Sequence, residues 1–254
     1  MIVELYRLSI GNEAWRYTTA QQALTHNGEE YEPVYCKRDA LKSTGEVARS
    51  GVKIYLPRDA DFVTRFAPTP PTDEAEVEIY QRDDSGTALV WLGRALTVSR
   101  KGSQAEIACD SIFSSMKTAG LRRPYQKPCP HALYDHNCRV TRANFRVDAT
   151  LTAVGSSALT LTATAFAGQP DGWFTGGDIE WGALPERRLI VGHSGDTITL
   201  ATPLGDAVAG DAVVAFAGCD HTFATCRDKF ANKANYGGTP FIPTQNPFGS
   251  DPVF

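Results

Sequence analysis

Four cysteines stand in two pairs that could bind a soft metal. Cys129 and Cys138 belong to the run CPHALYDHNC, and Cys219 and Cys226 belong to the run GCDHTFATC. Thiolates are typical ligands of zinc and of iron–sulfur clusters. The spacings C-x8-C and C-x6-C are wider than the knuckles of common zinc sites, and neither matches a ferredoxin run. Spacing alone leaves three interpretations open: one metal centre, two disulfides, or unrelated buried thiols.

The remaining cysteines and the histidines near the pairs have simpler interpretations. Cys36 and Cys109 each lie alone in a strand-like segment, where a cysteine is usually a small buried apolar residue. His131, His136 and His221 are expected to be solvated loop residues, with a spare ligand or a neighbour of the ligands as the alternative. The cysteine pairs are flanked by Pro128, Pro130 and Gly218. These residues predict loops whose backbone lies close to the thiols and directs N–H groups at the sulfur atoms.

Composition and charge limit the classes of function. The 254 residues are 42% hydrophobic and 21% charged, which is typical of a folded chain. A net charge of −4 gives no overall attraction to nucleic acid, and the basic run RKGSQ at 100–104 is too thin, so no specific nucleic-acid binding is expected. No apolar run is long enough to span a membrane, and the first residues lack a signal-peptide layout. We therefore expect synthesis in a cytoplasm, where disulfides are disfavoured.

The first 110 residues predict a β-barrel or a β-sandwich. Short segments of alternating apolar and polar residues lie between turn signals, as at EAEVEIYQRDD. DDSG at 83–86 predicts a hairpin turn, and the prolines of 67–74 predict an extended loop. A short helix is expected within 59–67, where an early aspartate suits a helix N-terminus.

The remainder of the chain predicts two further regions. Residues 147–216 have strand patterns separated by glycine turns, including HSGD at 193–196, which predicts a small inserted β-barrel. A short helix is expected within 225–238, ended by Gly237 and Gly238. Residues 239–254 predict an extended tail that lies on a partner, because four apolar residues would otherwise be exposed: Phe241, Ile242, Phe248 and Phe254. The predicted fold is mainly β, with domains at 1–120, at 147–216, and at 121–146 joined with 217–254 around the cysteines.

The C-terminal region of the chain resembles the tail-tip hub family of siphophages and gene transfer agents. The resemblance rests on WFTGGDIEWG and on GCD-x5-C-x2-KF-x-N-x2-N-x-GG-x-P-x-IP; it covers roughly 125–243 well and the N-terminal half in general character. It implies a virion component, a homotrimeric ring built on an N-terminal hub domain. The implied partners are the distal tail protein ring and a central fibre or spike hub protein, with the tape-measure protein as a further contact.

The cysteine spacing is similar to that of the phage lambda tail-tip protein L. This likeness implies that Cys129, Cys138, Cys219 and Cys226 bind a [4Fe–4S] cluster, with zinc, or no metal after oxidation, as the alternatives. Here some eighty residues separate the pairs, whereas the gap in the lambda protein is much shorter. The intervening module is then an insertion whose two ends meet at the cluster. This is possible because the two ends of a barrel commonly lie close together.

Two other functions are compatible with parts of the sequence. A metal-dependent hydrolase could use Asp135, His136 and Asp220, but the chain has no G-x-S-x-G, H-E-x-x-H, P-loop or paired-carboxylate motif. A redox module could use the cluster as its active centre, but no flavin or nicotinamide motif accompanies it. We therefore expect a structural protein rather than an enzyme.

Overall fold

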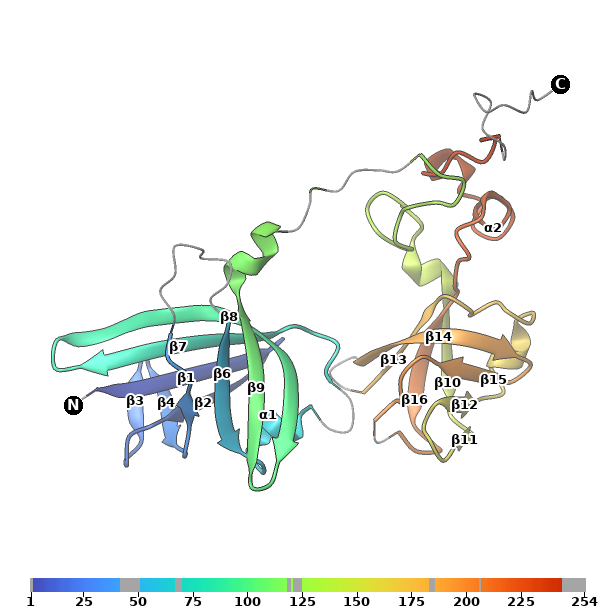
Figure 1. The fold of residues 1–254 in the computed structure, drawn as a ribbon. Coiled ribbons are helices and arrows are strands. Elements are labelled where there is room, and N and C mark those ends of the chain that lie inside the picture. The colour runs from blue at the N-terminus through green and yellow to red at the C-terminus, as the bar shows by residue number, and fades with distance from the viewer. Residues whose placement is uncertain are drawn as a thin grey trace. The chain divides into compact units, whose positions relative to one another are not determined.

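The computed structural model describes residues 2–41, 51–66, 70–117, 120, 125–182, 186–205 and 207–243. The chain divides into two compact units, Met1–Gly120 and Leu121–Phe254. Each is built mainly from strands, as the alternating segments predict (Figure 1). Among the described residues, none of the helices has the length and apolar character needed to cross a membrane.

The first unit is one curved sheet of nine strands. Its elements are β1 (Val3–Ile10), β2 (Glu13–Thr18), β3 (Leu24–His26), β4 (Glu29–Pro33), β5 (Lys37–Arg38), β6 (Val52–Pro57), α1 (Asp61–Thr64), β7 (Ala75–Asp83), β8 (Gly86–Lys101), β9 (Gln104–Ser111) and the 3-10 helix η2 (Ile112–Lys117). The strand order is β3-β4-β2-β1-β7-β8-β9-β6-β5. Within the described residues the edge strands β3 and β5 do not pair with each other. Over the described residues the sheet therefore forms a half-barrel, which is more open than the barrel that the pattern predicts. Residues 34–36 carry the chain from β4, beside one edge, to β5 at the other.

The concave face of this sheet holds the core of the first unit. Val77 and Ile79 on β7 are fully buried, while Glu76 before them is exposed and Glu78 between them is partly buried, which confirms the period-two pattern. Helix α1 places Phe62 and Val63 in the same core, both with no exposed surface. Register shifts interrupt the pairing of the long strand β8 with β7 and with β9. Such bulges bend a strand, so β8 can follow the curvature of the sheet.

The local predictions for the first unit are largely correct. Asp83 pairs with Gly86, and the Asp83 carboxylate accepts hydrogen bonds from the backbone N–H groups of Ser85 (2.8 Å) and Gly86 (3.1 Å), which builds the predicted hairpin turn. The predicted helix exists but covers only Asp61–Thr64. In the predicted loop, residues 67–69 lie outside the described residues, and 70–74 form no helix or strand.

The second unit contains a small barrel and the cysteine segments. Its elements are η3 (Arg142–Phe145), β10 (Arg146–Thr150), β11 (Ala153–Val154), β12 (Thr160–Thr162), η4 (Phe166–Gly168), β13 (Asp178–Trp181), β14 (Glu186–Ser194), β15 (Thr197–Leu200), β16 (Ala212–Phe216), α2 (Phe223–Asp228) and η5 (Lys233–Asn235). The strand order is β10-β16-β13-β14-β15-β12-β11. Because β10 and β11 are nearly consecutive in the chain yet stand at opposite ends of this order, the sheet closes around its core.

The two ends of this barrel lie side by side. Arg146, the first residue of β10, pairs with Phe216, the last residue of β16. The next backbone hydrogen bond joins the Ala217 N–H to the Phe145 carbonyl at 3.1 Å. The chain therefore enters and leaves the barrel at one place, next to both cysteine segments (Figure 1). The turn predicted at 193–196 is also present, with Gly195 at a φ of 57° between Ser194 and Thr197.

The predicted end of the C-terminal helix is wrong. Helix α2 ends at Asp228, and the Asn232 N–H donates to the Cys226 carbonyl at 2.9 Å across Ala231, whose φ is 49°. A left-handed residue just after a helix is usually glycine, and here it is alanine. Gly237 and Gly238 lie beyond a separate 3-10 turn and have another role. Of the predicted tail, Phe241 is 86% exposed and Ile242 is partly buried, whereas Phe248 and Phe254 lie outside the described residues.

Candidate metal centre

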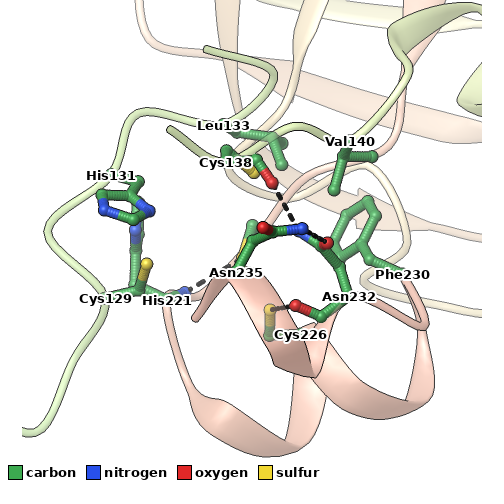
Figure 2. Close-up of a pocket in the computed structure, with 11 residues that line it drawn as sticks. Cys129, His131, Leu133, Cys138, Val140, His221, Cys226, Phe230, Asn232 and Asn235 are labelled. Atoms are coloured by element: carbon green, nitrogen blue, oxygen red, sulfur yellow. Dashed lines mark hydrogen bonds between the residues drawn. The ribbon is translucent and has the colours of Figure 1, made fainter. Parts of the chain in front are cut away.

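All four paired cysteines line one cavity in the second unit. Figure 2 shows Cys129 and Cys138 on the segment that precedes the barrel and Cys226 on the helix that follows it; Cys219 completes the lining. The cavity has a volume of about 20 Å³. All six cysteines of the chain are free thiols in this structure. Residues ninety positions apart in sequence therefore face the same small space.

The first segment positions Cys138 through a turn built on Asp135. The Asp135 carboxylate accepts hydrogen bonds from the backbone N–H groups of Asn137 (2.9 Å) and Cys138 (2.5 Å). The hydrogen bond from Cys138 is the main reason that the pKa of Asp135 lies below its ordinary value. On either side of this turn, Tyr134 and Arg139 have φ values of 67° and 61°. Side chains other than glycine adopt this backbone conformation rarely, and it is concentrated at functional sites.

The second segment positions its thiols through a turn and a capped helix. The Asp220 carboxylate accepts from the Thr222 N–H at 2.9 Å, and the Thr222 hydroxyl accepts from the Thr225 N–H at 3.2 Å. Thr222 is therefore the N-cap of α2, which carries Cys226. Between them, His221 has a φ of 61°. The turn at Asp220 and the capped helix thus direct the side chains of Cys219 and Cys226 into the cavity.

Backbone N–H groups approach two of the sulfurs, as the flanking residues predict. The His221 N–H donates to Cys219 Sγ at 3.3 Å, and the Gly237 N–H donates to Cys129 Sγ at 3.4 Å. The two segments are also joined directly, because the Cys129 N–H donates to the His221 carbonyl at 2.8 Å. Hydrogen bonds of this kind stabilise and tune thiolate ligands of a metal.

A small apolar cluster supports the cavity. Cys138, Val140, Ala217 and Phe230 are all buried in it. The rings of Phe230 and Phe145 lie 4.8 Å apart between centroids. This cluster fixes the distance between the first segment and the end of α2.

The barrel packs against the second cysteine segment through close backbone contact. A Cβ atom on Gly218 would lie 1.9 Å from the Thr175 carbonyl oxygen, and one on Gly177 would lie 2.1 Å from the Phe216 carbonyl oxygen. The Gly218 N–H donates to the Trp173 carbonyl at 3.0 Å. Only glycine fits at these two positions, which belong to the runs that resemble the hub family.

The buried thiols hold their protons strongly. Burial raises the pKa of Cys226 to about 11, with a further contribution from the neighbouring cysteines, and it also raises the pKa of Cys219. The Cys226 thiol donates to the Asn232 carbonyl at 3.4 Å. At neutral pH these two groups are therefore thiols and poor nucleophiles. A metal that binds here must displace their protons.

The chemistry of the donors fits a soft metal, and the cavity limits its size. Four thiols with two backbone N–H groups at sulfur suit zinc or an iron–sulfur cluster. However, no three potential ligands among the described residues converge into a group that would hold a metal ion as they stand. A volume of about 20 Å³ is close to the space of one water molecule. The four thiols therefore share one cavity without the geometry of a bound metal centre.

The other predicted site residues have different positions. His131 and His221 line the cavity with the cysteines, whereas His136, Asp135 and Asp220 do not. Both carboxylates are occupied by N–H groups of their own turns, so the structure does not assemble the hydrolase site considered above. In the first unit, Cys36 and Cys109 are 7% and 5% exposed, which confirms them as small buried residues.

Sequence reasoning missed the side chains that surround the thiols without ligating. Asn232 and Asn235 line the cavity, and the Lys229 ammonium donates to the carbonyls of Trp173 and Gly218. The run KF-x-N-x2-N-x-GG contains these three residues, and its polar side chains match no helix or strand pattern. That mismatch was the sequence signal that they serve the site. Only the contact with a distant segment reveals what they do.

Comparison with known proteins gives two family matches. The family described as "Baseplate hub protein, N-terminal attachment domain" matches residues 1–141, and the family described as "Phage conserved hypothetical protein BR0599" matches residues 172–246. Each match contains one cysteine pair. No curated protein matches the chain.

The whole chain aligns with a chain of a solved particle structure. It is described as "Virion of native gene transfer agent (GTA) particle" and aligns with a TM-score of 0.86 at 23% sequence identity. The alignment covers 100% of this chain and 92% of the other. At this level of identity the likeness establishes the shared fold, including the small barrel between the two cysteine pairs.

Proposed function

The chain belongs to the phage baseplate hub family, whose N-terminal attachment domain matches more than half of it, and we propose that it is a structural protein of the tail tip. The single observation that carries this proposal is the match over residues 1–141. The shared fold with a chain of a gene transfer agent particle supports the same location. Immunogold labelling or cryo-electron microscopy of assembled particles tests it, with the chain expected at the distal end of the tail.

The chain forms a homotrimeric ring between the distal tail protein ring and the central fibre or spike hub protein, with the tape-measure protein as a further contact. The half-barrel supports this arrangement, because the outer edges of β3 and β5 pair with no other described strand. Exposed strand edges usually pair with or are covered by another chain. Light scattering on the purified chain tests the stoichiometry; a monomer at all concentrations, together with a single copy in assembled particles, contradicts it.

The four cysteines bind a soft metal that cross-links the two cysteine segments of the second unit. We call this cross-link the staple. The resemblance to tail-tip hub proteins favours a [4Fe–4S] cluster, and the four thiols that line the cavity suit zinc as the alternative. The staple has a clear physical role, since it would join the two segments that flank the barrel. Reducing conditions in a host cell exclude disulfides from that role. Particles that carry Cys129→Ser are expected to assemble defective tails, and complete infectious tails would contradict the staple.

A redox or hydrolytic module is the alternative function. It requires an open coordination position and groups that take part in chemistry. The described carboxylates nearest the cysteines are bound by their own turns, so the structural function is better supported. Rapid reduction and reoxidation of a bound cluster by a defined electron donor, or hydrolysis that depends on the metal, would favour the alternative.

A further inference from the structure

The segment that follows the second cysteine pair returns to the first pair. We call residues 232–239 the clasp. The Asn232 side-chain amide donates to the Cys138 carbonyl at 2.5 Å, and its backbone N–H donates to the Cys226 carbonyl at 2.9 Å. Its own carbonyl accepts from the Cys226 thiol. Figure 2 shows Asn232 between these two cysteines, with the Asn235 amide donating to its side-chain oxygen at 2.6 Å. One asparagine thus joins one cysteine of each pair.

Tyr236 makes a second connection on the other side of the cavity. Its hydroxyl lies 2.6 Å from the Lys127 carbonyl oxygen and 3.2 Å from the His221 carbonyl oxygen. Lys127 is two residues before Cys129, and His221 is two residues after Cys219. Because the His221 carbonyl also accepts from the Cys129 N–H, these contacts form one hydrogen-bonded group. The hydroxyl therefore joins the remaining two cysteines through the backbone next to each.

The end of the clasp lies directly against the first segment. The Gly237 N–H donates to Cys129 Sγ, and the Thr239 N–H donates to the Gln126 carbonyl at 2.8 Å. A Cβ atom on Gly237 would lie 2.5 Å from His131 Nε2, and one on Gly238 would lie 2.3 Å from the Lys127 carbonyl oxygen. The paired glycines therefore permit a backbone contact that no other residue allows.

We propose that the clasp brings the four thiols to one cavity before any metal binds, with Asn232 and Tyr236 as its positioning residues. None of its hydrogen bonds needs a metal, and together they connect both cysteine pairs. Many small metal sites form only when the metal arrives, so that the metal itself supplies the free energy of folding. A preassembled site avoids that cost and binds metal more tightly. This inference rests on the proposed function, in which the four thiols bind a soft metal.

Thiol reactivity in the metal-free, reduced full-length chain tests the proposal. In the wild type, the paired cysteines are expected to react with an aromatic disulfide reagent at least tenfold more slowly than in urea-unfolded chain. Asn232→Leu is expected to raise their rate about tenfold, and Tyr236→Phe, which keeps the ring, about threefold. Tyr125→Phe is the matched control, because Tyr125 is 79% exposed. Wild-type thiols that react as fast as in urea would overturn the proposal.

Cobalt(II) titration supplies the second readout. Asn232→Leu and Tyr236→Phe are expected to weaken Co²⁺ binding while leaving the cobalt–thiolate spectrum of the saturated protein unchanged, since all ligands remain. Wild-type affinity in the double variant would overturn the proposal. The clasp and the metal centre can fail separately. A wild-type chain that protects its thiols but takes up no metal supports the clasp and contradicts the metal centre.

Discussion

The Lys229 ammonium lies 4.4 Å from the centre of the Trp173 ring and donates a hydrogen bond to the Trp173 carbonyl. It also donates to the Gly218 carbonyl at 2.7 Å. Burial lowers the pKa of Lys229 to about 8, which shows how closely the barrel and the second cysteine segment enclose it. This one side chain links the loop before β13 to the residue that precedes Cys219.

Lys229→Met is expected to destabilise the second unit by about 2 kcal/mol, because two enclosed carbonyl groups lose their donor while the apolar stem is kept. Urea denaturation followed by tryptophan fluorescence measures the change. Lys233→Met is the control, since Lys233 is exposed on the neighbouring 3-10 turn. Equal stability of the two variants would show that the Lys229 contacts contribute nothing.

Gly218→Ala is expected to lower the free energy of unfolding of the same unit by about 3 kcal/mol, the upper range for overpacking. The added methyl group would meet the Thr175 carbonyl oxygen and force the loop away from the cysteine segment. Gly168→Ala is the matched control, because no atom lies within 4 Å of its added Cβ. A tolerated Gly218→Ala, measured by the same denaturation experiment, would contradict the close contact.

Ala231→Gly is expected to stabilise the chain by up to about 1 kcal/mol, and Ala231→Val to destabilise it by about 1–2 kcal/mol. Ala231 has a left-handed backbone at the end of α2, which glycine adopts freely and valine does not. Thermal denaturation of both variants measures the effect. Identical melting temperatures would mean that Ala231 does not have a left-handed backbone in solution.

The metal-free chain is expected to lose stability at high pH. The pKa of Cys226 is raised to about 11 in the folded state, so its thiol contributes stability that is fully present below the unfolded pKa of about 9 and is lost as the pH rises through about 11. Cys226→Ser removes this contribution, so the stability of the wild type is expected to fall more steeply between pH 9 and pH 11. Parallel pH profiles for the two proteins would contradict the burial of this thiol.

Metal binding is expected to release protons for the same reason. At pH 7 the thiols of Cys219 and Cys226 are protonated in the folded chain, and a metal binds thiolates. The apparent affinity for zinc should therefore rise with pH. Calorimetry in buffers of different ionisation enthalpy counts the released protons, and an affinity that does not change between pH 6 and pH 8 would exclude thiolate ligation.

The sequence predicts the strands and tight turns well, because both depend on neighbouring residues. Alternation around Val77, the Asp83 turn and the Gly195 turn are local patterns, and each appears in the structure. The open half-barrel was not predicted, because closure of a sheet depends on contacts between strands that are distant in sequence.

The end of the C-terminal helix shows how local signals can mislead. Gly237 and Gly238 are typical of a helix end, but they serve the contact with His131 and Lys127, more than one hundred residues earlier. The helix ends at Asp228 instead, and the left-handed Ala231 turns the chain so that the Asn232 side chain reaches Cys138. The four cysteines were predicted as one site through the family resemblance, whereas Asn232, Tyr236 and Lys229 became visible only in the folded chain.

Metal and sulfide analysis of anaerobically purified full-length chain tests the central claim most directly. The predicted result is a brown protein with about four iron and four sulfide ions per chain, both lost in Cys226→Ser. One zinc ion per chain, also lost in Cys226→Ser, would contradict the cluster but support a zinc centre that cross-links the same two segments. A chain without bound metal, or with metal that survives the loss of Cys226, would contradict a metal centre formed by the four thiols.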